Sequence, residues 1–211
     1  DVNKAKEYFF EHLYALVLEE NEVIKEEREF ITNVLTSNIL DINYDSETFS
    51  KLLYIKEKYK VENIYSLEDY LKKVDIIPPS LALAQAAIES GWGKSRFIKE
   101  ANNIFGHWTY DSKYGIIPKQ RKFGASHFVR VFQSLRESVS AYMLNLNRNL
   151  AYKSFQEKRY EQRISQKHPE GLVLSQTMLN YSGIAQDYLK ILKDIILFNN
   201  LQNFDRRFYH T

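Results

Sequence analysis

Apolar residues recur at helical spacing along the first third of the chain. Phe9, Leu13 and Leu16 are three or four residues apart, and similar spacing continues toward Leu35. Such spacing gathers apolar side chains on one face of an α-helix. We therefore expect residues 1–77 to be mostly helical with polar outer faces. The run of charges at Glu19 to Glu29 is typical of a solvated helix face.

Two shorter helices are predicted in the same region. The polar residues 41–46 indicate a loop, and residues 47–59 have the pattern of a helix. Ser66 and Asp69 have the spacing of a capping box, in which the two side chains satisfy the free backbone amides at a helix start. A short helix is therefore expected from there to Lys73.

A clear boundary follows at Ile77-Pro78-Pro79-Ser80. Proline ends a preceding helix, and it is well accommodated near the start of the next one. Residues 81–90 consist mainly of Ala and Leu and are followed by Gly91, which predicts a tight, buried helix that ends at this glycine.

The second half combines a small β element with further helices. Glycines cluster within residues 101–131, and 127–132 is the most strand-like run, so we expect a small hairpin there. Ser134 and Glu137 form a second capping box at the start of another helix. Further helices are expected at 154–166, 170–180 and 186–199. The last residues, 203–211, are polar and aromatic without a clear period.

These elements predict a mainly α protein with a small β-hairpin. We expect a compact lobe over 75–202, a helical N-terminal extension over 1–74 that packs on it, and a C-terminal tail over 203–211. The 211 residues include only 7 Gly and 4 Pro, too few chain breakers for an all-β sandwich. The net charge of +2 requires neither a nucleic acid nor an anionic membrane as partner. The apolar runs are far shorter than the ~20 residues that span a bilayer, so no membrane span is expected.

Several kinds of site are excluded by the residues themselves. The chain has no cysteine, which rules out disulfides, thiol nucleophiles and cysteine-ligated metals. The five histidines are scattered without zinc-binding spacing. The run Gly91 to Ser95 resembles the end of a phosphate loop, but Ile88 stands where the first glycine is required. No metal and no cofactor is therefore predicted.

Glu89 is the strongest candidate for chemistry. It lies at the end of the Ala- and Leu-rich helix, and Trp92 follows three residues later. Burial beside apolar groups raises the pKa of a carboxyl, and such an acid can protonate a leaving oxygen near neutral pH. The alternative is an ordinary exposed glutamate on a helix surface.

Four blocks follow one another in order: residues 78–95, residues 101–106, residues 132–142, and Tyr181-Ser182-Gly183 with Asp187-Tyr188. Together they resemble the glucosaminidase domain of glycoside hydrolase family 73. Residues 115–121 and 145–147 are most similar to the Bax-like branch of Gram-negative bacteria. The resemblance covers about residues 75–200.

The resemblance implies a lysozyme-like α lobe whose small β element frames a groove. It implies cleavage of the β-1,4 bond after N-acetylglucosamine in peptidoglycan glycan strands, with export to the periplasm or cell envelope. Glu89 would be the general acid, and Tyr181 would lie near the reacting sugar; a buried core tyrosine is the alternative for Tyr181. The expected substrate-binding residues are Gln85, Ser90, Trp92, Asn103, Phe105, Gly106, Trp108 and Tyr110. Core packing is the alternative for at least one of the aromatic residues.

One departure from the family pattern bears on the mechanism. Many members carry a second glutamate in the β element, but residues 111–121 contain none, and Asp111 is the nearest carboxylate. We expect the acetamido oxygen of the substrate to attack the anomeric carbon, with Asp111 as a competing water activator. A lytic transglycosylase or muramidase of the same superfamily, or a glycan-binding module without activity, are the alternative functions.

Overall fold

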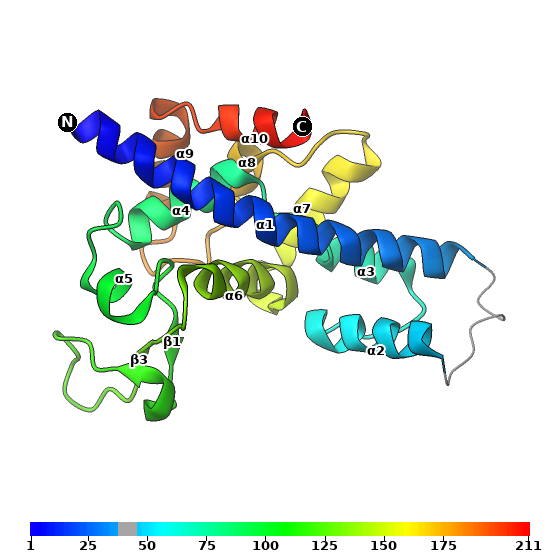
Figure 1. Ribbon diagram of the computed structural model, residues 1–211, viewed down its shortest axis with the longest axis horizontal. Coiled ribbons are helices and arrows are strands. Elements are labelled where there is room, and N and C mark those ends of the chain that lie inside the picture. Colours follow the sequence, from blue (N-terminus) through cyan, green and yellow to red (C-terminus); the bar gives the residue numbers. More distant parts are fainter. Residues whose placement is uncertain (38–45) are drawn as a thin grey trace.

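Helices dominate the computed structural model, which describes residues 1–37 and 46–211 (Figure 1). The predicted mainly α fold with a small β element is confirmed. Most of the predicted loop at 41–46 lies outside the described residues, apart from Ser46, which caps the next helix. The helices are α1 (Val2–Thr36), α2 (Glu47–Tyr59), α3 (Leu67–Lys73), α4 (Pro79–Glu89), α5 (Arg96–Ala101), α6 (Leu135–Arg148), α7 (Lys153–Ile164), α8 (Gly171–Ser175), α9 (Gln186–Phe198) and α10 (Gln202–Tyr209). Two 3₁₀ turns span Ser112–Tyr114 and Leu150–Tyr152.

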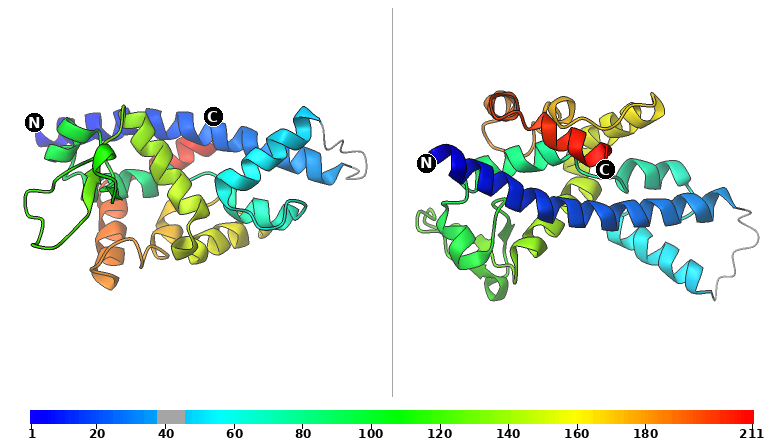
Figure 2. Two further views of the ribbon diagram at one scale, coloured as in Figure 1. Left: turned by 90° about the horizontal axis from the view of Figure 1, so that it is seen from below. Right: turned by 45° about the horizontal axis from the view of Figure 1, so that its top comes forward.

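Helix α1 runs along the length of the molecule, and most of the other elements lie beneath it in the left view of Figure 2. Its buried residues recur every three or four positions, as the sequence pattern predicts. The helix packs against α3, α4 and α6, so its apolar face forms part of the same core as the following helices. None of the helices in the described part of the chain combines the length and apolar character that a bilayer crossing requires.

The expectation of a solvated face over Glu19–Glu29 is wrong for part of that stretch. Glu27 is buried and accepts hydrogen bonds from Lys58 Nζ at 2.8 Å and from the Tyr59 hydroxyl at 2.9 Å. Arg28 donates to backbone carbonyls of the α3 region. These charges face α2 and α3, which cover α1 there; tertiary packing of this kind is not visible in local charge spacing.

Helix α4 lies at the centre of the fold. Pro79 occupies its first turn, and every residue from Pro79 to Ala87 is buried. The helix contacts α1, α8, α9 and α10, and the small side chains of its four alanines allow these helices to approach it. It ends at Glu89, and Gly91 then adopts a positive φ of 54°, as expected for a glycine after a helix end.

The β element has three short antiparallel strands rather than the two of a hairpin. They are β1 (Trp108–Thr109), β2 (Gly115–Ile116) and β3 (Phe128–Arg130), in the order β1-β3-β2. Val129 pairs with both Trp108 and Ile116. A Cβ on Gly115 would lie 2.4 Å from Phe128 Cβ, so only glycine fits where β2 approaches β3 this closely.

The C-terminal residues without a clear period form a helix, α10. Asp205 on α10 is buried and accepts hydrogen bonds from Ser80 N and Oγ, at 2.8 and 2.7 Å, and from Gly171 N at 3.0 Å. These bonds fix α10 against the starts of α4 and α8. These tertiary hydrogen bonds explain why α10 forms, although its apolar pattern is too short to predict a helix from the sequence. The helix expected at 170–180 ends earlier, at Ser175.

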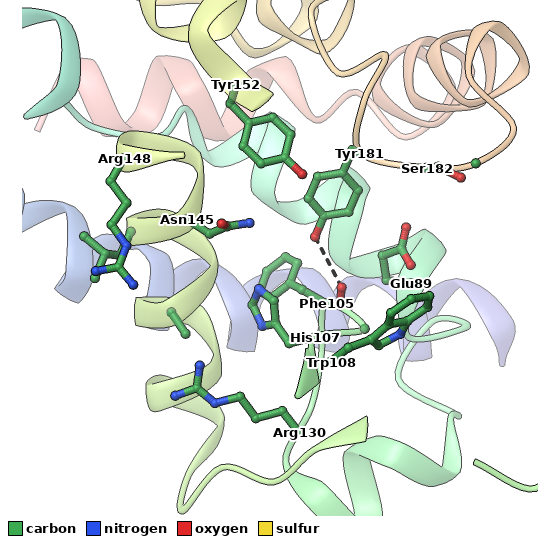
Figure 3. Close-up of a pocket in the computed structure, with 14 residues that line it drawn as sticks. Glu89, Phe105, His107, Trp108, Arg130, Asn145, Arg148, Tyr152, Tyr181 and Ser182 are labelled. Carbon is green, nitrogen blue, oxygen red and sulfur yellow. Dashed lines mark hydrogen bonds between the residues drawn. The ribbon is translucent and has the colours of Figure 1, made fainter. Parts of the chain in front are cut away.

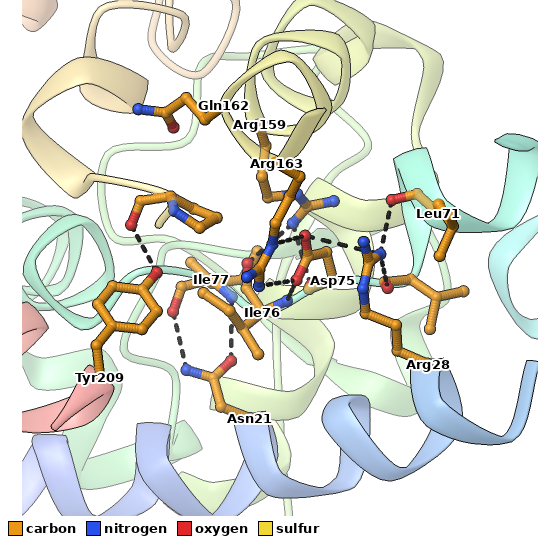
Figure 4. A network of polar contacts seen from close by, with 12 residues as sticks. Asn21, Arg28, Leu71, Asp75, Ile76, Ile77, Arg159, Gln162, Arg163 and Tyr209 are labelled. Atoms are coloured by element: carbon orange, nitrogen blue, oxygen red, sulfur yellow. Dashed lines mark hydrogen bonds and ion pairs between the residues drawn. The ribbon is translucent and has the colours of Figure 1, made fainter. Parts of the chain in front are cut away.

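A buried charged cluster holds the segment that leads into α4 (Figure 4). Asp75 is fully buried, and Arg163 donates two hydrogen bonds to it at 2.9 and 2.7 Å. Arg28 lies 3.7 Å from the same carboxylate. Arg159, also fully buried, donates to the carbonyls of Asp75 and Ile76. The cluster therefore joins α1, α7 and the approach to α4.

Candidate active site

A groove of about 720 Å³ opens beside the end of α4 (Figure 3). Its walls come from the loop before β1, from α6 and from the turn before α9. The lining residues are Glu89, Phe105, Gly106, His107, Trp108, Arg130, Ala141, Leu144, Asn145, Arg148, Tyr152, Tyr181, Ser182 and Gly183. The structure therefore brings five of the predicted site residues to one groove: Glu89, Tyr181, Phe105, Gly106 and Trp108.

Glu89 is half-buried where α4 ends. Its burial raises the pKa of the carboxyl above the ordinary value, and a hydrogen bond with Tyr188 opposes that shift in part. A Cβ on Gly106 would lie 3.3 Å from Glu89 Oε2, so a glycine lets the loop pass close to the carboxyl. The result is a carboxylic acid that keeps its proton to a higher pH than an exposed glutamate and faces the groove.

A chain of buried hydrogen bonds positions Glu89 from behind. The Tyr142 hydroxyl donates to Gln85 Oε1, and Gln85 Nε2 donates to the Tyr188 oxygen at 3.2 Å. Tyr188 already accepts from Gln85, so its own hydroxyl proton is directed to Glu89. Gln85 is thus fully buried one turn before Glu89 and outside the groove lining; it orients the tyrosine that bonds the acid.

Tyr181 closes the groove above Glu89 (Figure 3). Its hydroxyl donates to the Phe105 carbonyl at 3.2 Å, and its ring stacks on Tyr188 with centroids 5.8 Å apart. Burial raises the pKa of Tyr181 well above its ordinary value, so the hydroxyl stays protonated. Because its proton is engaged by a carbonyl, the Tyr181 oxygen can accept a hydrogen bond from a ligand.

The loop before β1 is held by Asn103. The buried Asn103 side chain donates to the carbonyls of His107 and Arg130, both at 2.9 Å, and accepts from His107 N at 3.1 Å. Phe105 stacks on Tyr142 with centroids 3.8 Å apart. Asn103 therefore shapes the groove wall from behind. Trp108 lines the groove with 63% of its surface exposed, although its ring also stacks on His127 with centroids 4.5 Å apart.

Besides Gln85 and Asn103, four other predicted site residues lie outside the groove lining. Ser90 is buried, donates to the Ala86 carbonyl and accepts from Gly93 N, so it caps α4. Trp92 packs against aromatic rings of α1. Tyr110 is 76% exposed. Asp111 is exposed and accepts a hydrogen bond from Lys113 N at 2.9 Å, which starts a 3₁₀ turn.

The structure adds groove residues that the sequence reasoning missed. They are His107, Arg130, Asn145, Arg148, Tyr152 and Ser182, with Tyr188 behind the groove. Burial and the nearby charge of Arg130 lower the pKa of His107 to about 4, so its imidazole is neutral. Tyr188 and Asn145 belong to blocks that carry the family resemblance, which was an available signal. The two arginines follow no motif, and only the fold brings them together.

The sequence matches the model of the Glucosaminidase family, described as mannosyl-glycoprotein endo-beta-N-acetylglucosaminidase, over residues 65–201. The chain belongs to this family. It is also 31% identical over 188 residues to Protein bax of Escherichia coli (strain K12), a region that covers 87% of this chain and 65% of that protein. The chain thus spans 65% of the length of this relative. No solved structure matches the chain. The resemblance read from the sequence blocks is confirmed.

Proposed function

We propose that this protein is a peptidoglycan hydrolase that cleaves the β-1,4 bond after N-acetylglucosamine in the cell envelope. Family membership supports a glycan substrate. The observation that carries the proposal is Glu89, a half-buried carboxyl with a raised pKa that faces an open groove. A carboxyl in this state is suited to protonate a glycosidic oxygen, a step that contributes about 10²- to 10⁴-fold to a rate.

The reaction begins with proton transfer from Glu89 to the glycosidic oxygen as its bond to the anomeric carbon breaks. The acetamido oxygen of the same sugar attacks that carbon and forms a cyclic intermediate. Water then opens the ring, and the Glu89 carboxylate takes up the proton that the water releases. This order of events needs only one protein carboxylate. It is supported by the lining, in which Glu89 is the single carboxylate among the described residues.

Tyr181 assists the attack through its oxygen. Its proton is engaged by the Phe105 carbonyl, so the oxygen can accept a hydrogen bond from the acetamido N–H. That contact orients the acetamido group and stabilises the positive charge that develops on it. Trp108 offers an exposed ring for stacking on an adjacent sugar.

The test is mass spectrometry of borohydride-reduced fragments after incubation with purified peptidoglycan. We expect reduced N-acetylglucosamine at the new ends. Reduced muramic ends would replace the proposal by a muramidase, and anhydromuramic ends by a lytic transglycosylase. The absence of fragments from folded protein that still binds peptidoglycan would replace it by a glycan-binding module.

Asp111→Asn separates the two possible mechanisms. We expect nearly unchanged turnover, because Asp111 is exposed, caps a 3₁₀ turn and lies outside the groove lining. Rates of reducing-end formation measure the effect. A loss of several orders of magnitude would show that Asp111 activates water, and the substrate-assisted route would then be abandoned.

A further inference from the structure

The groove carries two arginines on the side away from Glu89 (Figure 3). Arg130 is the last residue of β3, and Arg148 is the last residue of α6. Asn145, one turn before Arg148, lines the same wall. Three side chains rich in hydrogen-bond donors, from β3 and α6, thus line the groove.

The charges of these two arginines are not neutralised by the protein. Neither Arg130 nor Arg148 forms an ion pair with a described residue, whereas five other arginines do: Arg28, Arg96, Arg136, Arg163 and Arg207. The guanidinium of Arg130 lies 4.6 Å from the centroid of the Phe132 ring. Arg148 makes only a long hydrogen bond, 3.5 Å, to the Lys58 carbonyl. Both guanidiniums therefore retain donors for a ligand.

The remaining groove does not offset this charge. Glu89 is the one carboxylate among the described lining residues, so the lining holds at most one negative charge against the two arginines, and burial raises the pKa of that carboxyl. A concave surface with unneutralised charges of one sign concentrates its field in the groove and attracts ligands of opposite charge. The groove is therefore electropositive at the end opposite the acid, although the whole chain carries a net charge of only +2.

We propose that Arg130, Arg148 and Asn145 form a subsite for a carboxylate carried by the glycan strand. This inference rests on the proposed function and adds a substrate class to it. A guanidinium matches a carboxylate with two parallel hydrogen bonds, and an amide adds a further donor. In an alternating strand, N-acetylglucosamine is neutral, whereas the muramic residue carries a lactyl group. That lactyl carboxylate is free in strands without peptides; in substituted strands the stem peptide supplies carboxylates of its own.

The subsite would fix the orientation and register in which a glycan strand binds in the groove. With a carboxylate-bearing residue bound at the arginine end, the strand can place its sugars in only one register relative to Glu89. A neutral chain of N-acetylglucosamine lacks this anchor and can slide through the groove. The arginines thus select anionic strands over neutral ones.

The experiment compares three soluble substrates: strands with stem peptides, strands from which an amidase has removed the peptides, and neutral chito-oligosaccharides. The variants are Arg148→Gln, Arg130→Gln and the double variant. Arg206→Gln on α10, outside the groove lining, is the matched control because it removes the same charge. Circular dichroism verifies that each variant is folded. KM and kcat are measured separately, at low and at high salt.

We expect the double variant to raise KM for an anionic strand by roughly tenfold or more, the effect of losing charge-assisted hydrogen bonds. The preference for anionic over neutral substrate falls by a similar factor, and the salt dependence of KM becomes weaker. Arg148→Lys restores charge without the planar fork and recovers only part of the loss. An effect confined to peptide-free strands identifies the lactyl carboxylate, and one confined to substituted strands identifies the stem peptide.

An unchanged preference in the folded double variant, for both anionic substrates, would overturn the subsite. If the wild-type protein cleaves none of the three substrates, the proposed hydrolase activity fails separately. Binding of the same strands, followed by the fluorescence of Trp108 in the groove, then decides the subsite. Weaker binding of anionic strands to the double variant than to Arg206→Gln supports it, and equal binding refutes it.

Discussion

The segment before α4 and the end of α4 each hold a carboxylate that is removed from water, and the two behave in opposite ways. Burial alone would raise the pKa of both. At Asp75, hydrogen bonds from Arg163 and the charges of Arg28 and Arg159 outweigh burial, and the pKa lies below its ordinary value. At Glu89, only the Tyr188 hydrogen bond opposes burial, and the pKa rises.

The difference shows that burial does not determine the role of a carboxyl; its partners do. Three arginines keep Asp75 charged, so it can hold α1 and α7 to the chain that enters α4. The tyrosines near Glu89 provide no positive charge, so burial raises the pKa of this carboxyl, which faces the groove. Asp75 is thus suited to stabilising the fold, and Glu89 to the proton transfer that we propose.

Glu89→Gln gives the largest expected effect. The amide keeps the shape of the side chain but cannot donate an acidic proton, so turnover should fall by about 10²- to 10⁴-fold. The free energy of unfolding should not decrease at neutral pH, because a carboxyl with a raised pKa is replaced by a neutral group. Reducing-end assays and urea unfolding measure the two quantities. An active Glu89→Gln variant would contradict its role as the acid.

Asp75→Asn should instead lower the free energy of unfolding. Breaking a buried ion pair leaves its arginines without a counter-charge and costs about 3–5 kcal/mol of unfolding free energy. The control is Glu22→Gln, which breaks an exposed pair with Lys25 and should cost less than about 0.5 kcal/mol. Urea unfolding measures both. Equal stability of the two variants would show that the Asp75 cluster does not hold the helices together.

Glu89 and Asp75 also differ in how far the sequence alone could predict them. Glu89 could be predicted as a candidate acid because it shares one short helix with Ala and Leu residues, which is local information. The two capping boxes, at Ser66 and Ser134, were likewise local, and both serines accept the expected amide hydrogen bond. The buried cluster at Asp75 could not be predicted from the sequence, because its arginine partners are 47 to 88 residues away in the chain.

The groove residues show the same limit of prediction from local sequence. Glu89 and Tyr181 belong to blocks that resemble the family, but Arg130 and Arg148 are isolated in the sequence, and only the fold brings both to the groove lining. Trp92 illustrates the opposite case. It lies three residues after Glu89 in the sequence, yet it packs against aromatic rings of α1 and lies outside the groove lining.

Two tyrosine variants test whether the hydrogen bond from Tyr188 affects the pKa of Glu89. Tyr188→Phe removes the hydrogen bond that favours the Glu89 carboxylate, so the pKa of Glu89 rises further. The acid form then persists to higher pH, and the alkaline limb of the kcat/KM profile moves upward. Tyr59→Phe removes a buried hydrogen bond to Glu27 and should lower the unfolding free energy by about 1.5 kcal/mol without moving that limb. A limb that shifts in Tyr59→Phe or stays fixed in Tyr188→Phe would contradict the assignment.

The smallest expected effect is an opposite pH dependence of stability at the two carboxyls. The folded pKa of Glu89 lies above its ordinary value of 4.5, so its contribution to folding is fully present below that value and is lost as pH rises through the folded pKa. The folded pKa of Asp75 lies below 3.8, so its contribution is present above that value and is lost as pH falls through the folded pKa.

Urea unfolding of the wild type, Glu89→Gln and Asp75→Asn from about pH 3 to about pH 8 measures both trends. The stability of the wild type relative to Glu89→Gln should fall as pH rises, since only the wild type must ionise a half-buried acid. Its stability relative to Asp75→Asn should instead fall as pH drops, since protonation removes the charge that the arginines require. Trends of the same sign would mean that partners do not distinguish the two carboxyls, and the contrast between them would then rest on position alone.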